Sequence, residues 1–377
     1  MKKILYTATV VKTHVMQFHV PCLKMLQEMG WQTEVASKND YEDPADCVIP
    51  CCDHYYDIPF ERMPWNPRNR QAYRMLRDLI EKNHYDVIHC HTPVGALITR
   101  LAARKARKQG TKVVYTAHGF HFYKGAPLLN WLFYYPAEWL TAPLTDVLIT
   151  INREDYDFAR KHLKAKKILY IPGVGIDREK FCPEREAGLQ KRQELGIAED
   201  DFVMLTVAEM TKNKNHETIL KALALLKDRP EFAHFQYLIV GRGQQREALE
   251  TLASQLGIQD HVRFLGYRSD GADLCRASDL FLFMSFREGL SVALMEAMSS
   301  GLAVICTKIR GNTDLIRDGE NGVFSENNPE SLSKEILHLY ENPDLRQRLG
   351  AEASASAERF QRREILKQMQ EMYEDLF

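Results

Sequence analysis

The sequence predicts two doubly wound α/β domains, each built around a parallel β-sheet, and three observations support this fold class. The chain has 377 residues, which is more than one hydrophobic core usually supports. Apolar segments of strand length alternate with longer segments of helical periodicity, as in successive strand–helix–strand units. The apolar segments are near-continuous runs rich in Val, Ile and Leu, which is typical of parallel strands buried on both faces.

About eleven segments are expected to form strands, a number better divided between two sheets than held in one. In the first half of the chain they are KILYTATV (3–10), TEVAS (33–37), DVIHC (86–90), KVVYTA (112–117), DVLITI (146–151) and ILYIPG (168–173). In the second half they are DFVMLTVAE (201–209), QYLIVG (236–241), VRFLGY (262–267), DLFLFM (279–284) and LAVICT (302–307).

The boundary between the domains is expected in YIPGVGIDREKFCPE (170–184), where two glycines and a proline interrupt the pattern before a charged helix. The first domain is therefore placed at 1–178 and the second at 179–355. A last helix at about 356–377 carries apolar residues along one face. We expect this C-terminal helix to pack back onto the first domain.

The composition excludes several classes of protein. A formal net charge of −1 gives no reason to expect a nucleic-acid partner. The eight cysteines are scattered without a C-x-x-C pair, which indicates reduced cysteines in a cytoplasmic protein and no cysteine-built zinc site. The N-terminal MKKILYTATVV leads into polar residues and is interpreted as a first strand, not as a signal peptide. No segment reaches the ~18 uncharged apolar residues that a membrane helix needs.

The stretch FREGLSVALMEAMSSGLAV (286–304) carries two glutamates, Glu288 and Glu296, around the expected start of a helix. Ser291 is the expected N-cap, and the free N–H groups at 289–291 (Gly289, Leu290 and Ser291) would form an anion site. Carboxylates on either side suit hydroxyl groups, so the pattern fits a ligand of sugar, diphosphate and ribose. The alternative is that Glu288 only complements the helix dipole and that Glu296 is a solvated helix residue.

This stretch resembles the signature of retaining GT-B glycosyltransferases of family four. Similar blocks of bacterial capsule and exopolysaccharide members occur in the same order at HCHTPVG (89–95), VVYTAHGFHFYKGAP (113–127), YIPGVGID (170–177), KNKNHETIL (212–220), LIVGRGQQREALE (238–250), VRFLGYRSD (262–270) and IRGNTDLIRDGENGVF (309–324). The resemblance implies two Rossmann-like domains facing across a cleft, with the acceptor bound by the first and the nucleotide sugar by the second. It implies a retaining, metal-independent transferase without a cofactor. The expected donor is a UDP-sugar, with N-acetylhexosamines among the candidates, and the expected acceptor is a saccharide or lipid-linked saccharide in cell-surface polysaccharide synthesis.

The resemblance also implies roles for individual residues. Glu288 corresponds to the glutamate of the donor sugar, Glu296 to that of the ribose, and Lys214 to the lysine that neutralises the diphosphate. His118, directly after the strand at 112–117, corresponds to a histidine that lies against the donor sugar. We therefore expect His118, Lys214 and Glu288 to be catalytic. Arg263 falls where the family's backbone meets the nucleobase, although a surface arginine is the alternative.

Gly241, with Gly243, follows the strand at 236–241 and would let the backbone approach the ligand, with simple turn formation as the alternative. In two places the chain departs from its relatives. Many relatives have Gly-Arg where this chain has Ala208-Glu209, and a carboxylate cannot neutralise the diphosphate. Many also have a Gly-Gly pair in the first loop; here Thr13 and His14 would have to face the phosphate instead.

Two patterns suggest a metal, and neither is taken as a site. His89 and His91 point to the same side of a strand, but no third ligand is evident, so structural roles are favoured. Asp155 and Asp157 form a D-x-D motif, which lies in a helix-forming segment behind Asn152.

A peripheral membrane contact is expected from two neighbouring features. One is the basic run RLAARKARKQG (100–110), and the other is PLLNWLFYYPAEWLTAPL (127–144), which is aromatic and carries one charge. Basic and apolar surfaces together favour the membrane interface; a solvated helix end and a core helix are the alternatives. The chain is therefore expected in the cytoplasm, in contact with the inner face of the cell membrane.

Three other functions fit parts of the pattern. A GT-B sugar-nucleotide epimerase would share the fold and the donor site but would need acid and base residues in place of an acceptor pocket. A non-catalytic sensor would bind the nucleotide sugar and turn nothing over. A nucleotide-dependent dehydrogenase would need G-x-G-x-x-G after the first strand, and TATVVKTH (7–14) has no glycine.

Overall fold

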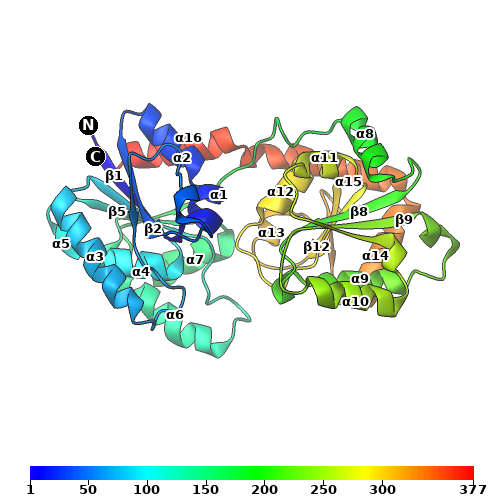
Figure 1. The fold of residues 1–377 in the computed structure, drawn as a ribbon, viewed down its shortest axis with the longest axis horizontal. Helices are drawn as coiled ribbons and strands as arrows, with labels where there is room; N and C mark the ends of the chain where they lie inside the picture. The colour runs from blue at the N-terminus through cyan, green and yellow to red at the C-terminus, as the bar shows by residue number, and fades with distance from the viewer. The chain divides into compact units, whose positions relative to one another are not determined.

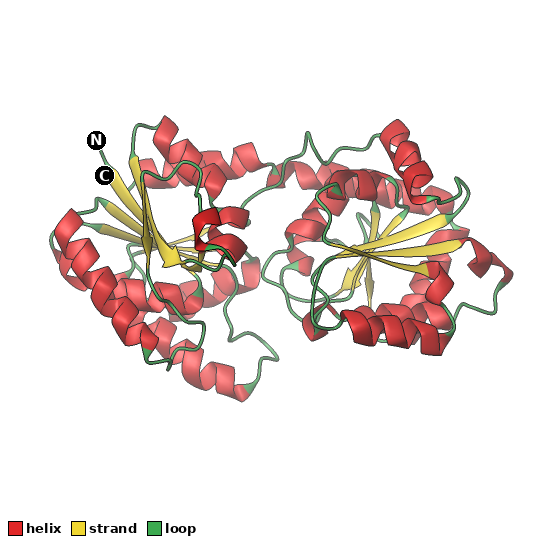
Figure 2. Cartoon of the chain, in the orientation of Figure 1, coloured by secondary structure: helices red, strands yellow, loops and turns green.

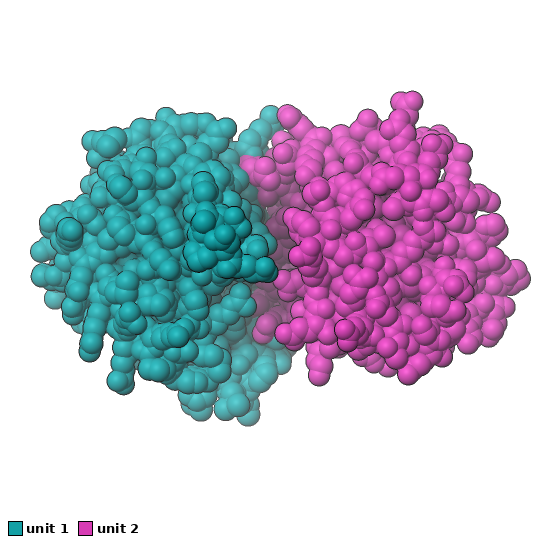
Figure 3. All heavy atoms as spheres, in the orientation of Figure 1, with its two compact units in different colours: residues 1–174, 363–377 teal, residues 175–362 magenta.

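The computed structural model describes residues 1–377, which form two compact units. Unit 1 is Met1–Val174 together with Arg363–Phe377, and unit 2 is Gly175–Arg362 (Figure 3). The division falls at 174 and not at the expected 178, because Ile176 bridges to Gln361 and donates its N–H to Phe360 O at 2.9 Å. The same contacts keep residues 357–362 in unit 2. The chain therefore returns to unit 1 at Arg363, later than the position 356 at which the C-terminal helix was expected to begin.

Unit 1 contains a seven-stranded parallel sheet of order β3-β2-β1-β4-β5-β6-β7. Its strands are β1 (Lys3–Val10), β2 (Gln32–Lys38), β3 (His54–Asp57), β4 (Val87–His91), β5 (Lys112–Ala117), β6 (Val147–Thr150) and β7 (Lys167–Tyr170). All six strands expected in this half are present. The unexpected one is β3, a short edge strand with exposed ends.

Helices cover both faces of this sheet (Figures 1 and 2). They are α1 (Met16–Phe18), α2 (Val20–Glu28), α3 (Arg68–Asn83), α4 (Pro93–Ala102), α5 (Arg104–Lys108), α6 (Leu128–Thr141), α7 (Arg153–His162) and α16 (Arg362–Glu374). Successive residues of β1 point to opposite faces: Tyr6 packs with α2 and α16, whereas Leu5 packs with α3 and α4. The C-terminal helix α16 thus forms part of the core of unit 1.

Unit 2 contains a six-stranded parallel sheet of order β10-β9-β8-β11-β12-β13. Its strands are β8 (Phe202–Val207), β9 (Phe235–Val240), β10 (Val262–Gly266), β11 (Leu280–Phe283), β12 (Ala303–Thr307) and β13 (Val323–Ser325). Its helices are α8 (Arg185–Leu195), α9 (His216–Ala224), α10 (Arg246–Leu256), α11 (Gly271–Arg276), α12 (Val292–Ser299), α13 (Asn312–Leu315), α14 (Pro329–Glu341) and α15 (Pro343–Ser356). The five expected strands are present, and β13 is an additional edge strand.

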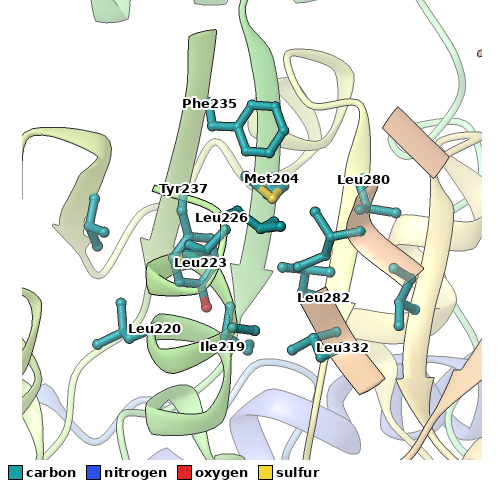
Figure 4. Close-up of a cluster of buried hydrophobic side chains, with 14 of the residues drawn as sticks. Met204, Ile219, Leu220, Leu223, Leu226, Phe235, Tyr237, Leu280, Leu282 and Leu332 are labelled. Atoms are coloured by element: carbon teal, nitrogen blue, oxygen red, sulfur yellow. The ribbon is translucent and has the colours of Figure 1, made fainter. Parts of the chain in front are cut away.

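The core of unit 2 fills the space between the sheet and helices α9 and α14. Figure 4 shows Met204 of β8 and Leu282 of β11 facing Ile219 and Leu223 of α9, with Leu332 of α14 beside them. All five side chains are buried. Together with the two parallel sheets, this packing confirms the predicted fold class. None of the helices combines the length and the hydropathy that crossing a membrane requires.

The first prediction concerns the attachment of α16. Tyr373 Oη lies 2.5 Å from Tyr6 Oη and 2.6 Å from His89 Nδ1, and all three side chains are buried. Tyr373→Phe leaves these groups poorly paired and should lower the free energy of unfolding by about 1–3 kcal/mol. The control is Tyr340→Phe in α14, because the hydroxyl of Tyr340 makes no hydrogen bond. Urea unfolding curves that coincide for both variants would contradict this role of Tyr373.

Candidate active site

The carboxyl ends of β8 and β11 are adjacent where the strand order of unit 2 reverses, which is where open α/β sheets bind ligands. Lys214 follows β8, Glu288 follows β11, and Lys214 Nζ donates to Glu288 Oε1 at 2.7 Å. Two bonds join the loops: Phe286 N–H donates to Asn213 O at 2.8 Å, and the Asn213 amide donates to Arg287 O at 2.9 Å. The structure therefore brings two of the predicted catalytic residues together in a partly buried ion pair.

The loop after β11 leads directly into α12. Ser291 is the N-cap, as predicted, and its Oγ accepts from Leu294 N–H at 3.2 Å. The N–H groups of Gly289, Leu290 and Ser291 donate to no acceptor within the protein. Gly311 packs behind them, because a Cβ there would lie 2.4 Å from Gly289 O. The segment is held rigidly with its free amides at a helix start, where an anion is stabilised.

Glu296 lies on α12, one turn beyond the helix start, and its side chain is half-buried. Burial raises the pKa of its carboxyl from 4.5 to about 7, although the positive charges of Lys180 and Arg362 oppose the shift. The side chain makes no hydrogen bond in the protein. The Glu296 carboxyl can therefore accept hydrogen bonds from a ligand without breaking any hydrogen bond within the protein.

Gly241 and Gly243 lie against the loop after β8. A Cβ on Gly241, whose φ is +148°, would lie 2.0 Å from Ala208 O, and a Cβ on Gly243 would lie 2.3 Å from Met210 O. Met210 N–H also donates to Arg242 O at 2.9 Å. These glycines therefore allow two loops of the protein to approach each other, as the turn-forming alternative requires, and the approach of Gly241 to a ligand stays a prediction.

Arg263 lies near the start of β10, away from the carboxyl ends of the strands. Its Nε donates to Gln236 Oε1 at 3.0 Å, and its Nη1 donates to the carbonyl of Leu195 at the end of α8. The guanidinium thus holds the C-terminus of α8 against the sheet. Its side chain does not join Lys214 and Glu288, and the contact of the Arg263 backbone with a nucleobase stays a prediction.

The structure adds one residue that sequence reasoning missed. Arg310, in the loop after β12, is 8% exposed and donates from Nε to Glu288 O at 3.2 Å. It places a second cation behind the Glu288 loop, whereas Glu209 is exposed to solvent. The block IRGNTD (309–314) belongs to the family resemblance, but only the fold shows that it follows the end of β12. A neighbouring cavity of about 500 Å³ is lined by Phe286, Lys308 and Phe324 and by none of the predicted donor residues.

In unit 1, His118 follows β5 as predicted and contacts His91 at the end of β4. His91 Nδ1 lies 3.2 Å from His118 Nε2, and burial lowers the pKa of His118 to about 4. The loop after His118 is held by Asp155, whose Oδ2 accepts from Phe120 N–H at 2.9 Å, while Asn152 caps α7 by accepting from Asp155 N–H. Asp155 thus has a structural role in the loop after His118, and the D-x-D motif lies at the start of α7, the helix expected behind Asn152.

His89 and His91 differ in their surroundings. His89 uses both ring nitrogens, with Nδ1 2.6 Å from Tyr373 Oη and Nε2 2.8 Å from Thr116 Oγ1. His91 turns instead towards His14, His19 and His118. Further histidines therefore lie beside His91, which the strand pattern alone did not reveal.

The first loop binds a carboxylate of the protein itself. Asp40 accepts from the N–H of Lys12 at 2.5 Å and from the N–H and Oγ1 of Thr13 at 3.3 and 2.9 Å. Thr13 and His14 line a pocket of about 210 Å³ that also contains Arg62. The N–H and hydroxyl of Thr13, which was expected to face a phosphate, are thus already paired with Asp40, whose carboxylate would repel one.

The basic run 100–110 is not a free basic patch. Arg100 is 1% exposed and pairs with Glu138 at 2.8 Å. Lys105 pairs with Glu81 at 3.1 Å and Arg107 with Asp146 at 2.9 Å. Three cations of the run thus neutralise acids of unit 1, whereas Arg104 and Lys108 are exposed, and the contribution of this run to a membrane contact stays a prediction.

The aromatic segment, by contrast, is exposed. Helix α6 turns outward a row of large apolar side chains that are 46–85% exposed: Leu128, Leu129, Leu132, Phe133, Trp139 and Leu140. Trp65, 67% exposed, lies with its ring centroid 6.2 Å from that of Phe133 and extends the row. An apolar surface of this extent on a folded unit is typical of a binding surface.

Two parallel-sheet units, with an ion pair and a helix start at the carboxyl edge of the second, define the chain as a GT-B protein. Comparison with known proteins agrees: the family "Glycosyl transferases group 1" matches residues 189–356 and "Glycosyltransferase Family 4" matches residues 22–180. The chain is 40% identical to EpsD of Bacillus subtilis (strain 168), over 99% of this chain and 96% of EpsD. EpsD carries the name of a glycosyltransferase. The chain therefore belongs to glycosyltransferase family four and is a glycosyltransferase.

Two further relatives extend this similarity. The UDP-Gal:alpha-D-GlcNAc-diphosphoundecaprenol alpha-1,3-galactosyltransferase of Escherichia coli is 31% identical over 67% of this chain and 65% of its own length. Among solved structures, HepE (Alr3699) of Anabaena in complex with UDP and glucose superposes with a TM-score of 0.81 over 100% of both chains, at 21% identity. The glycosyltransferase WaaG superposes with a TM-score of 0.78 over 98% and 99% of the chains, at 19% identity. The structural matches show the shared fold.

The second prediction follows from the raised pKa of Glu296. The folded pKa, about 7, exceeds the 4.5 of an ordinary glutamate, so this group stabilises the fold below pH 4.5 and loses that contribution as the pH rises through 7. Glu296→Gln should therefore leave the free energy of unfolding unchanged near pH 4.5 and raise it by about 1–3 kcal/mol at pH 8. Unfolding curves at both pH values measure this, with the exposed Glu247→Gln as control. Equal stability of the variant and the wild type at pH 8 would contradict the buried position of this carboxyl.

Proposed function

We propose that the chain transfers a sugar, with retention of anomeric configuration, from a UDP-sugar to a saccharide on a lipid-linked acceptor in cell-surface polysaccharide synthesis. The single observation that carries the proposal is the partly buried Lys214–Glu288 pair beside the free amides of 289–291. A cation and amides suit a diphosphate, and a carboxylate beside them suits sugar hydroxyls. Binding of UDP by HepE and the UDP-Gal donor of the Escherichia coli enzyme support the choice of nucleotide.

Each residue then has a defined task. Lys214 exchanges Glu288 for the diphosphate, and the released Glu288 carboxylate accepts hydrogen bonds from hydroxyls of the donor sugar. Glu296 accepts hydrogen bonds from the ribose diol. Negative charge grows on the leaving diphosphate as the glycosidic bond breaks, so Lys214 and the amides stabilise the transition state more than the bound donor. His118, neutral because burial lowers its pKa, is assigned to the donor sugar.

Retention is proposed to follow front-face attack, in which the acceptor hydroxyl loses its proton to the leaving phosphate. The side chains then act by positioning and by electrostatic stabilisation. The cation and the amides at the leaving group supply the positive potential that a magnesium ion supplies in other transferases. Transfer is therefore proposed to need no divalent metal and no cofactor.

The acceptor is proposed to reach the enzyme at a lipid surface, with α6 as the contact. The row of apolar side chains on α6 is adjacent to Trp65, and a groove of about 780 Å³ runs from Trp65 past Arg70 and Arg74 to Leu97 and Leu101 of α4. Aromatic and aliphatic groups with neighbouring arginines match the interface of an anionic membrane. A glycan carried on a lipid, as for the Escherichia coli relative, would be bound there.

A GT-B epimerase and a non-catalytic sensor share the donor site, and incubation with the donor distinguishes them. The proposed transferase should convert a UDP-sugar only when an acceptor is present. An epimerase would change the sugar without an acceptor, and a sensor would bind it unchanged. Either result would overturn the proposal.

The third prediction concerns Lys214. Lys214→Ala should reduce turnover by 10²–10³-fold, about 3–4 kcal/mol of transition-state stabilisation, with a smaller effect on donor affinity. Lys212→Ala, on the same turn but exposed and without an ion pair, should keep most of the activity. Steady-state kinetics with a saturating acceptor measure both. A loss of less than about threefold for Lys214→Ala would place the diphosphate elsewhere.

The fourth prediction concerns the membrane contact of α6. The double variant Leu132→Glu/Phe133→Glu removes two exposed apolar groups and adds charge, so binding to vesicles of anionic phospholipid should weaken at least about tenfold. Leu225→Glu, at a leucine of unit 2 that is 54% exposed, should bind as the wild type does. Sedimentation with vesicles measures the bound fraction. Undiminished binding of the double variant would exclude α6 as the contact.

A further inference from the structure

Four histidines of unit 1 meet near the carboxyl ends of β4 and β5. His14 and His19 come from the first loop and its helix, His91 ends β4 and His118 follows β5. One ring nitrogen of each lies within 4.8 Å of those of the other three. We call these four residues the histidine cluster.

Three histidines of the cluster have ring nitrogens without a partner. The Nε2 atoms of His14, His19 and His91 are buried and make no hydrogen bond, and the side chains of His19 and His91 are only 4% and 2% exposed. Native proteins rarely leave a buried polar group unsatisfied, and here three occur within one group. His89, next to the cluster, has both nitrogens bonded and behaves as an ordinary core histidine.

We propose that the histidine cluster binds one divalent transition-metal ion, with zinc as the best match, through the four imidazoles. Imidazole nitrogen is a preferred ligand of zinc. Magnesium and calcium require oxygen ligands, and the four side chains offer none. The site lies within unit 1 and uses no cysteine.

The geometry is close to what zinc requires. With Zn–N distances of about 2.0–2.1 Å, tetrahedral ligand nitrogens lie about 3.3 Å apart. His91 Nδ1 and His118 Nε2 are 3.2 Å apart, and one ring nitrogen of each of the four residues lies within 4.8 Å of the other three. The imidazoles therefore have to rotate before all four nitrogens reach the tetrahedral spacing, and the ring of His91 can offer either of its nitrogens. His14 lies on the short helical segment Val11–Val15 that follows β1, and its side chain is half-buried.

The cluster is also chemically ready and accessible. Burial lowers the pKa of all four imidazoles, so the rings are neutral at pH 7, which is the form that ligates a metal. His19, His91 and His118 line a cavity of about 40 Å³, which exceeds the ~10–15 Å³ that one water needs. His14 lines the neighbouring pocket of about 210 Å³, which offers a route of entry.

The bound ion would tie the first loop to the sheet and would occupy the His118 nitrogen that the proposed function assigns to the donor sugar. The metal is therefore proposed as a ligand that competes with the donor and not as a cofactor. Sugar transfer should therefore persist in the presence of EDTA, and zinc should bind whether or not the protein transfers a sugar. The two proposals can fail independently.

The test is titration of the full chain with zinc against a chromophoric chelator. One equivalent should bind tightly, and cobalt(II) should give the intense visible bands of a tetrahedral nitrogen site. His14→Ala and His91→Ala should each weaken binding at least about 100-fold, more than the loss of an outer-shell partner. His14 is half-buried whereas His91 is fully buried, so His14→Ala should disturb the fold less than His91→Ala. Circular dichroism checks that both variants are folded.

His234→Ala is the matched control. It belongs to the other group of potential ligands, the exposed Asp200, Asp201 and His234, and should leave tight binding unchanged. The proposal is overturned if no equivalent binds, if the cobalt spectrum is octahedral, if His14→Ala and His91→Ala bind as the wild type does, or if His234→Ala removes the tight site.

Discussion

The constraint on which the structure depends is that both sheets are parallel and are covered by helices on both faces. Buried on both sides, their strands can carry only apolar or fully paired side chains, so groups for chemistry are confined to the strand ends. Lys214, Glu288 and the start of α12 lie at such an end in unit 2, and His91 and His118 lie at another in unit 1. The long apolar strands and the location of the polar groups thus have the same physical origin.

Much of the fold was predictable because it depends on local patterns. The eleven expected strands have long apolar runs, whereas β3 and β13 are short edge strands whose sequences resemble loops. The cap at Ser291 follows from residue type and spacing alone. The placement of Lys214 and Glu288 in one site needed the family resemblance, because 74 positions separate the two residues, and their ion pair was not predicted.

What could not be predicted was the partner of each charged or polar side chain. Arg263, Arg100 and Thr13 looked available in the sequence, but the structure gives them Leu195, Glu138 and Asp40 as partners. These contacts depend on where distant segments meet, which spacing along the chain does not specify. The histidine cluster is another example, since its members come from positions 14 to 118.

The exposed Glu209 changes how positive charge is arranged in unit 2. Where the family resemblance implies an arginine, this chain leaves a carboxylate in solvent; Lys214 follows β8, and Arg310 is buried behind the Glu288 loop. Arg310 contacts the backbone of Glu288 and so acts on the position of the loop. Less positive charge at the surface increases the reliance on Lys214 and on the amides of 289–291.

The near-neutral pKa of Glu296 has a thermodynamic consequence for the proposed reaction. Burial raises the pKa of this carboxyl to about 7, so the protonated form is populated in the free protein near neutral pH, whereas the ribose diol is best bound by the ionised form. Each binding event should therefore release a fraction of a proton to the solution. The apparent enthalpy of UDP-sugar binding would then vary with the ionisation enthalpy of the buffer, and acidification of the solution would weaken the binding of the donor.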